Sequence, residues 1–204
     1  MIRKSIIFAH KSINFIVAII SLILFLICLY AMIDAYNVYV GASDTGILKY
    51  KPVAGNTEIL RELSGDAVAW LTVDNTKIDY PVMQAGDNDW FLTHLPDGTE
   101  NKNGSIFMDF RSPADFSDRH TILYGHNMRT GTMFGELVEY GKEGYYEAHP
   151  TLLLATPTSG NYLLEVFSGY VVPGNSDIYQ LTFESDSQYE TYLERIRKLS
   201  DFVS

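Results

Sequence analysis

Hydrophobic and polar residues follow three patterns along the chain, and the first is an unbroken apolar run. Residues 13–33 read INFIVAIISLILFLICLYAMI and contain no charged side chain. About 20 apolar residues in a helix span the roughly 30 Å hydrocarbon layer of a membrane. A cleaved signal peptide has a shorter apolar run and a small-residue cleavage site, which the residues after the run match poorly. The run therefore predicts an uncleaved transmembrane anchor, and its lack of a polar face argues against a core helix.

Charge predicts the orientation of this anchor. Three basic residues precede the run, and none follows it until Lys49; they are Arg3, Lys4 and Lys11. Basic residues stay on the cytoplasmic side of a membrane. We therefore expect a cytoplasmic flank over 1–12, a single pass through the cell membrane over 13–33, and an extracellular domain. Turn and breaker residues in GASDTG and KPVAGN predict a stalk over 34–55.

The second pattern consists of short apolar or alternating runs separated by turn clusters. Runs of this length and spacing are typical of strands in an antiparallel sandwich or barrel. Pro81 lies within one of them, which suggests an edge position or a bulge. The six predicted strands are 67–73, 78–84, 104–110, 120–126, 151–157 and 161–172.

The third pattern is helical. Thr57 is placed to cap a short helix over 57–63, and helical patches follow near 87–95 and between 132 and 149. The end of the chain predicts an amphipathic helix whose apolar positions recur at helical spacing; they are Tyr189, Leu193, Ile196 and Leu199. No further strand follows to cover this face, and open sheets expose edges that natural proteins avoid. We therefore expect the domain to be incomplete at its carboxyl end.

Composition narrows the possible functions. The net charge of −10 and pI near 4.8 argue against nucleic acid as a partner, because a phosphate backbone requires a basic patch. The single cysteine, Cys28, excludes an internal disulfide and any multi-cysteine metal site. Cys28 lies deep in the apolar run, where a thiolate would be costly, so it is interpreted as a small apolar residue and not as a nucleophile.

The polar residues give few specific signals of chemistry. The five histidines show no tight ligand spacing, so a metal-dependent hydrolase lacks support and no metal is expected. No Gly-x-Ser-x-Gly turn is present for a serine nucleophile. Isolated acidic residues are interpreted as a solvated face; they are Asp74, Asp79, Asp109 and Asp115.

His126 differs from the other histidines in its position. The predicted strand TILY delivers it to a turn, GHN. A side chain at the end of a strand is well placed for catalysis, because the sheet holds it rigidly and nearby loops shape a cleft. The residues alone leave two readings open: a catalytic acid or base, or a half-buried histidine whose ring nitrogens bond to neighbours.

Four blocks of the sequence resemble one family. They are WLTVDNTKIDYPVMQ (70–84), DNDWFLTH (87–94), GSIFMDFR (104–111) and TILYGHNMRTGTMFGEL (121–137). In order and spacing they resemble the class B sortases, which are membrane-anchored cysteine transpeptidases of Gram-positive bacteria. The resemblance covers about residues 56–204 and, in architecture, the anchor.

This resemblance implies a mainly β fold with helical additions: a sortase-type β-barrel, here incomplete with its last strands missing, preceded by one transmembrane helix. It implies that a cysteine attacks a sorting signal near the carboxyl end of a surface protein and forms a thioester. An amine of the peptidoglycan precursor or cross-bridge then resolves that thioester. The family's catalytic histidine corresponds to His126, and no cofactor is implied.

The chain also departs from the family pattern. It contains no TLSTC-like segment and no cysteine after Cys28, and Arg195 and Arg197 do not match the position of the family's arginine. We therefore expect the 204-residue chain to lack transpeptidase activity. The alternative is a non-catalytic, membrane-anchored pseudoenzyme that binds peptides in the same groove.

The resemblance further places four residues along the peptide groove: Asn88, Leu92, Tyr124 and Leu181. Each has a second interpretation. Asn88 could instead cap a helix that starts at Asp89, and the other three could be core residues. The expected partners are thus surface proteins with a carboxyl-terminal sorting motif, a peptidoglycan amine, and membrane lipid around residues 13–33.

Overall fold

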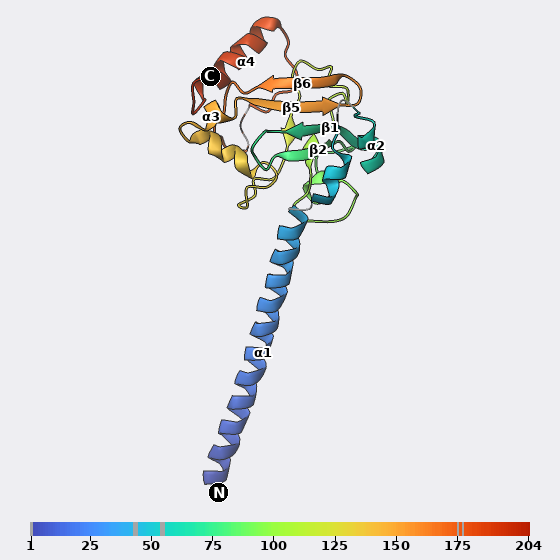
Figure 1. Cartoon of the computed structure of the whole chain (residues 1–204). Helices are drawn as coiled ribbons and strands as arrows, with labels where there is room; N and C mark the ends of the chain where they lie inside the picture. The colour runs from blue at the N-terminus through green and yellow to red at the C-terminus, as the bar shows by residue number, and fades with distance from the viewer. Residues whose placement is uncertain (1, 43–44, 54–55, 175, 177) are drawn as a thin grey trace. The chain divides into compact units, whose positions relative to one another are not determined.

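The computed structural model describes residues 2–42, 45–53, 56–174, 176 and 178–204. The chain divides into two units, a helical one that ends at Gly41 and a β-rich one from Ala42 to Ser204. Figure 1 shows the long helix of the first unit and the sheet and short helices of the second.

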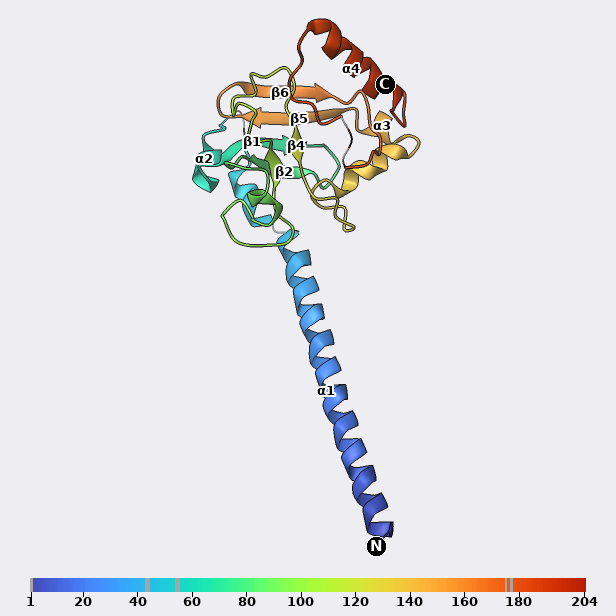
Figure 2. The same cartoon turned by 180° about the vertical axis from the view of Figure 1, so that it is seen from behind.

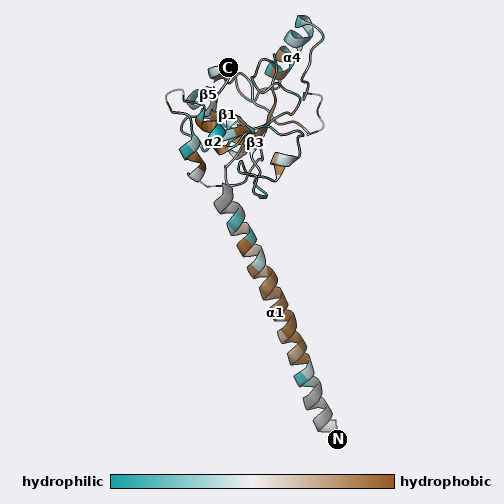
Figure 3. Cartoon of the chain, turned by 90° about the vertical axis from the view of Figure 1, so that its right-hand side faces the viewer, coloured by the Kyte–Doolittle hydropathy of each residue, from teal (hydrophilic) through white to brown (hydrophobic). Residues whose placement is uncertain are grey.

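The first unit is formed by one helix, α1 (Ile2–Ala42), whose last residue, Ala42, already belongs to the second unit. Within it, His10–Asn37 is long and apolar enough to cross a membrane, with a mean hydropathy of 3.1, and Figure 3 shows the apolar colouring along its middle. The helix extends beyond the predicted span of 13–33 because residues 34–40, DAYNVYV, contain no Gly or Pro, and it ends just after Gly41. Part of the predicted stalk, 34–42, is therefore helical, while residues 43–44 and 54–55 lie outside the described residues.

The second unit is built on one six-stranded sheet in the order β4-β3-β2-β1-β5-β6. The sheet curls into a half-barrel accompanied by helices, which confirms the predicted mainly β fold with helical additions. Figures 1 and 2 show it from the front and from behind. The strands are β1 (Ala67–Thr72), β2 (Asp79–Met83), β3 (Ile106–Met108), β4 (Leu123–Tyr124), β5 (Thr151–Thr156) and β6 (Gly160–Glu165).

The sequence pattern predicted an antiparallel sheet, but the observed sheet contains one parallel pair of strands. β2 and β3 pair in parallel, and the chain between them passes through a short 3-10 helix, η2 (Trp90–Leu92). Parallel neighbours need a long crossover, which residues 84–105 provide. Pro81 lies in an interior strand rather than at an edge; its ladder with β3 begins one residue later, at Val82. The register shift lies in the opposite strand, between Ala67 and Ala69.

Short helices flank the sheet. They are the 3-10 helices η1 (Thr45–Tyr50) and η3 (Gly135–Gly141), and the α-helices α2 (Ile59–Leu63) and α3 (Tyr145–Ala148). The predicted cap of α2 was wrong: its N-cap is Glu58, and Thr57 contributes only its carbonyl, to the amide of Leu60.

Alternation along the strands gives the sheet two apolar faces. On β1, Ala69 and Leu71 point to one face and Trp70 to the other. The first core cluster is Ala69, Leu71, Val73, Ile78, Val82, Ile106, Met108, Met133 and Leu154. The second, covered by α2, η1 and η2, is Leu60, Ala67, Trp70, Met83, Phe91, Phe107 and Ala155.

The chain ends in α4 (Asp186–Lys198), which the hydrophobic spacing predicted. Ser185 caps it, since its hydroxyl oxygen accepts a bond from the amide of Gln188 at 3.2 Å. The predicted apolar face is covered in part: Ile196 is buried, and Tyr189 and Leu193 pack beside it with aromatic residues of 167–183, whereas Leu199 follows the helix and is 42% exposed. Tyr192, which was not predicted on this face, is also buried. The covering residues come from the segment just before the helix rather than from a strand.

β6 forms one edge of the sheet, and all six of its residues are exposed. Leu163 is 70% exposed, although its partner on β5 is another leucine, Leu153. In Figures 1 and 2, β6 lies between α4 and the rest of the sheet.

Candidate active site

His126 lies two residues beyond β4, where the strand leaves the sheet. Its ring is half-buried, and Nε2 lies 2.7 Å from the carbonyl oxygen of Leu92. The carbonyl of His126 accepts a bond from the amide of Phe134 at 3.0 Å, which fixes the backbone of the turn. One contact from the following loop and one from a distant segment therefore hold this histidine.

The contact with Leu92 determines how the ring can act. A carbonyl oxygen can only accept, so in the neutral ring the proton lies on Nε2 and the lone pair on Nδ1. Nδ1 can then take up a proton while Nε2 continues to donate to Leu92. The imidazole can thus cycle between its two protonation states without losing this anchor.

Leu92 is positioned by η2 and by Gly104. Gly104 has a φ of 57°, and a Cβ there would lie 2.4 Å from the carbonyl oxygen of Phe91 and 2.6 Å from that of Leu92. Only glycine accepts both this backbone conformation and this close approach. The glycine therefore allows the chain before β3 to lie directly against η2 and the carbonyl that binds His126.

A buried carboxylate lies at the other end of β4, where the amide of Asp109 donates to the carbonyl of Ile122 at 3.0 Å. Asp109, just after β3, has an exposed fraction of 0%. It accepts bonds from the Nδ2 of Asn88 at 3.0 Å and from the hydroxyl of Tyr124 at 2.9 Å. Arg111 donates to both carboxylate oxygens at 2.8 Å, a two-point contact. Asp109 thus joins two residues predicted to line the groove.

The sequence interpretation of Asp109 as a solvated acid was wrong. The same holds for Asp79, which is half-buried and accepts bonds from the indole of Trp70 and the hydroxyl of Thr72. One signal was present in both cases: each aspartate lies in an apolar strand segment, where a charge needs partners.

These contacts shift the ionisation of the cluster. The hydrogen bonds from Arg111, with others from Asn88 and Tyr124, hold the pKa of Asp109 well below its usual range. The bond to Asp109 raises the pKa of the Arg111 guanidinium. Burial, reinforced by Asp109, raises the pKa of Tyr124 to about 12. At neutral pH the cluster therefore holds one anion, one cation and a neutral phenol.

Asn88 is not a helix cap. Its Oδ1 accepts the amide of Phe110 at 3.0 Å, whereas the side chain of Asp87 accepts the amides of Asp89 and Trp90 at the start of η2. Both ends of the Asn88 amide are therefore used to join η2 to the end of β3.

The remaining groove candidates are Leu92 and Leu181, and their surroundings differ. The Leu92 side chain is 37% exposed, so it is not a core residue. Leu181 is half-buried, and no hydrogen bond, ion pair or ring contact given for the described residues links it to His126. Its neighbour Gln180 contacts another histidine, since its carbonyl lies 2.7 Å from Nδ1 of His120.

Two other histidines stack on aromatic rings. His94 stacks on Trp90 at 3.7 Å between ring centroids, and His149 stacks on Tyr145 at 4.2 Å. Among the described residues, no group of three or more His, Cys, Asp or Glu side chains is arranged to hold a metal ion.

Comparisons with known proteins place this arrangement in a family. No protein-family model matches the chain. Sortase B of Listeria monocytogenes is 37% identical over 145 residues, which is 71% of this chain. Sortase B of Staphylococcus aureus is 34% identical over 143 residues, or 70% of this chain. The chain spans 58% of the length of each of these relatives.

Solved structures agree with the sequence comparison. A Bacillus anthracis sortase B in complex with AAEK1 gives a TM-score of 0.72 at 34% identity, covering 85% of this chain and 84% of that one. The Staphylococcus aureus sortase B–substrate complex gives 0.71 at 31% identity, covering 78% and 73%. Since the sequence blocks, the curled sheet and these relatives all agree, the chain belongs to the class B sortase family.

Proposed function

We propose that this protein works as a sortase. The reaction of the family cleaves a sorting signal near the carboxyl end of a surface protein and passes the acyl group through a cysteine thioester to a peptidoglycan amine. The 204 residues supply the peptide groove and the acid–base histidine of that reaction but not its cysteine. The observation that carries the proposal is His126 just beyond the end of β4, with Nε2 bonded to the carbonyl of Leu92, a residue of the predicted groove.

In this proposal His126 is the acid and base. It protonates the leaving amine when the thioester forms and later deprotonates the incoming amine. The bond from Nε2 to Leu92 supports this role, because it orients the ring and leaves Nδ1 to exchange the proton.

The thiol of the reaction is not supplied by the extracellular unit of this chain. The one cysteine, Cys28, lies inside α1 within the apolar span. We therefore expect the 204-residue chain by itself to bind a sorting signal without forming a thioester.

The groove is proposed to run past Asn88, Leu92 and Tyr124, with Leu181 as a fourth contact. The Asp109 contacts support the first and third positions, since they fix the amide of Asn88 and the phenol of Tyr124. For Leu181 the support is only the family resemblance.

The proposed location is the cell membrane, with α1 as a single-pass anchor. The basic residues before the apolar run support a cytoplasmic amino terminus and an extracellular β-rich unit. Membrane lipid then surrounds the span, and surface proteins and peptidoglycan meet the enzyme outside the cell.

Peptide binding by the full chain in lipid nanodiscs tests the proposal. The probes are fluorescent carboxyl-terminal segments of surface proteins from a Gram-positive bacterium, and the readout is polarisation. We expect Leu92→Ala to weaken binding about tenfold, as for loss of a buried leucine contact. Leu163→Ala, on the exposed edge strand, is the control and should bind normally.

Three results would refute the proposal. The first is equal binding by Leu92→Ala and the unmodified chain, and the second is no binding to any sorting segment. The third is a covalent adduct on Cys28 in the intact-protein mass spectrum, which would place the nucleophile where we exclude it. Peptide binding with no adduct is the expected outcome.

A further inference from the structure

The loop of residues 127–135 follows the imidazole of the candidate site and is called the imidazole loop below. Its two ends meet, since Asn127 forms an isolated antiparallel bridge with Met133. Its start also lies against its end: a Cβ on Gly135 would come within 2.1 Å of the carbonyl oxygen of Met128. The loop is therefore compact, and a few outside contacts are enough to set its position.

Met133 is the strained residue of the imidazole loop. It is 5% exposed and has a φ of 53°, a left-handed conformation that is uncommon for a residue with a side chain. Such a conformation persists only where the surrounding contacts impose it. The next residue, Phe134, donates its amide to the carbonyl of His126 at 3.0 Å. The geometry of that bond thus depends on what holds Met133.

A tyrosine of β2 holds Met133 from outside the loop. The hydroxyl oxygen of Tyr80 accepts the amide of Met133 at 3.3 Å. Burial, opposed in part by this bond, raises the pKa of Tyr80, so the phenol is neutral at physiological pH. Tyr80 is itself fixed by the ladder in which it pairs with Leu71 of β1. The end of the imidazole loop is therefore attached to an interior strand of the sheet.

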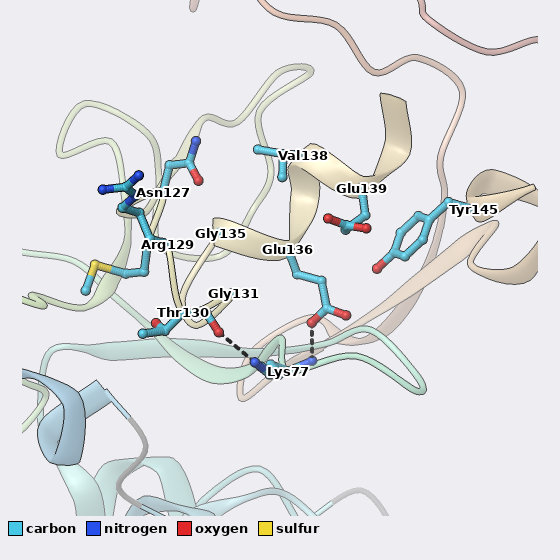
Figure 4. Close-up of a pocket in the computed structure, with 11 residues that line it drawn as sticks. Lys77, Asn127, Arg129, Thr130, Gly131, Gly135, Glu136, Val138, Glu139 and Tyr145 are labelled. Atoms are coloured by element: carbon cyan, nitrogen blue, oxygen red, sulfur yellow. Dashed lines mark hydrogen bonds between the residues drawn. The ribbon is translucent and has the colours of Figure 1, made fainter. Parts of the chain in front are cut away.

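Lys77 holds the tip of the imidazole loop. Its Nζ donates to the carbonyl of Thr130 at 2.6 Å, and its backbone amide donates to the carboxylate of Glu136 at 2.6 Å. Figure 4 shows both bonds as dashed lines, at the edge of the cavity that these residues help to line. Lys77 thus contacts both the loop and the start of η3, which follows it.

The turn that carries Lys77 is a rigid support. The amide of Val73 donates to the carbonyl of Ile78 at 2.8 Å, and the hydroxyl of Thr76 donates to the carbonyl of Val73 at 2.8 Å. Val73 and Ile78 are both buried in the core. Since Lys77 and Tyr80 belong to the same β1–β2 hairpin, their three bonds reach the loop and η3 from one fixed element.

We propose that the β1–β2 hairpin is a clasp that positions His126, with Lys77 and Tyr80 as its positioning residues. The inference rests on the proposed function, in which the imidazole is the acid and base. The two side chains act through the loop backbone and the bond from Phe134 to the His126 carbonyl. With the clasp closed, Nε2 stays on the Leu92 carbonyl and the other ring nitrogen keeps one orientation.

Amide hydrogen exchange, followed by NMR on the full chain in detergent micelles, tests the clasp. The Phe134 amide reports on the loop. The Gln84 amide, which donates to the Asp66 carbonyl at 2.9 Å, reports on the far end of the hairpin. We expect Lys77→Met and Tyr80→Phe each to speed exchange at Phe134 about tenfold, as for loss of one hydrogen bond, and to leave Gln84 unchanged.

A second readout follows the imidazole itself. In the unmodified chain the bond from Nε2 to Leu92 selects one neutral tautomer, which long-range nitrogen NMR of the ring detects. Both variants should convert His126 into a mixture of tautomers, an effect that a general loss of stability would not produce in the folded protein. Lys77→Arg keeps a donor for the loop and should restore the single tautomer.

Two matched variants serve as controls. Lys142→Met removes an exposed lysine that pairs with Glu139 of η3, close to the loop in sequence but outside the clasp. Tyr162→Phe removes a hydroxyl from β6. Both should leave the exchange rates and the ring signals as they are in the unmodified chain.

Unchanged exchange at Phe134 in either clasp variant would overturn the inference, and so would an unchanged His126 tautomer. Equal acceleration at Gln84, or the same effects in the controls, would also overturn it. If the NMR results hold but no sorting segment binds the unmodified chain, the proposed function is lost and the clasp remains. If sorting segments bind and the NMR results fail, only the clasp is lost.

Discussion

Replacing Asp109 by asparagine tests how much the buried carboxylate contributes. One oxygen accepts bonds from the amide and Nε of Arg111, and the other accepts bonds from Asn88, Tyr124 and Nη2 of Arg111. An asparagine must turn its NH2 group toward one of these sets, so at least two donors lose their acceptor. At about 1–1.5 kcal/mol each, the free energy of unfolding should fall by about 2–3 kcal/mol.

Urea unfolding followed by tryptophan fluorescence measures this loss. Both tryptophans, Trp70 and Trp90, belong to the β-rich unit, so the signal reports on that unit alone. Asp97→Asn is the matched control, because Asp97 is exposed and asparagine can still accept the Thr99 amide. A change below about 0.5 kcal/mol in Asp109→Asn, or an equal loss in the control, would refute the reasoning.

Acid titration gives an independent check on Asp109. Its folded-state pKa lies well below the ordinary value of about 4. Its contribution to stability is therefore fully present above that ordinary value and is lost as the pH falls below it. The unmodified chain should lose stability more steeply below about pH 4 than Asp109→Asn; parallel curves would contradict this.

Three further predictions concern the same unit. In the same urea assay, Gly104→Ala should lower the free energy of unfolding by at least about 2 kcal/mol, because of backbone strain and overlap with η2. Gly98→Ala is the comparison: Gly98 has a φ of 83° but open space around it, so the loss should be only about 1 kcal/mol. Because the folded pKa of Tyr124 is raised to about 12, its contribution is present below pH 10 and lost between pH 10 and about 12; Tyr124→Phe should remove that part of the alkaline loss of thermal stability. Ile196→Ala, at a buried position of α4, should lower the free energy of unfolding by about 3 kcal/mol. Asp186→Asn, in an exposed ion pair with Arg119, should lower it by less than about 1 kcal/mol. The reverse order would show that charge and not packing holds the helix.

Local patterns predicted most of the elements. β1, β2, β5 and α4 lie within a few residues of the expected ranges, because alternation and helical spacing are properties of neighbouring residues. The parallel pairing of β2 with β3 was missed, since it depends on how the connecting segment folds back rather than on either strand.

The candidate site was predictable only where it depends on neighbouring residues. The position of His126 at a strand end follows from the local sequence, but its contact with Leu92 joins residues 34 positions apart. Asp109 was misjudged because its partners Asn88 and Tyr124 lie 21 and 15 positions away. A single sequence shows that such a carboxylate exists but not which donors surround it.

The exposed edge of β6 affects how the protein behaves at high concentration. A strand edge with unpaired backbone groups and an exposed leucine is a template for another chain of the same kind. Self-association by strand addition would then compete with correct folding during overexpression. A lysine in place of Leu163 would introduce a gatekeeper charge at that edge and extend the working range of soluble concentration.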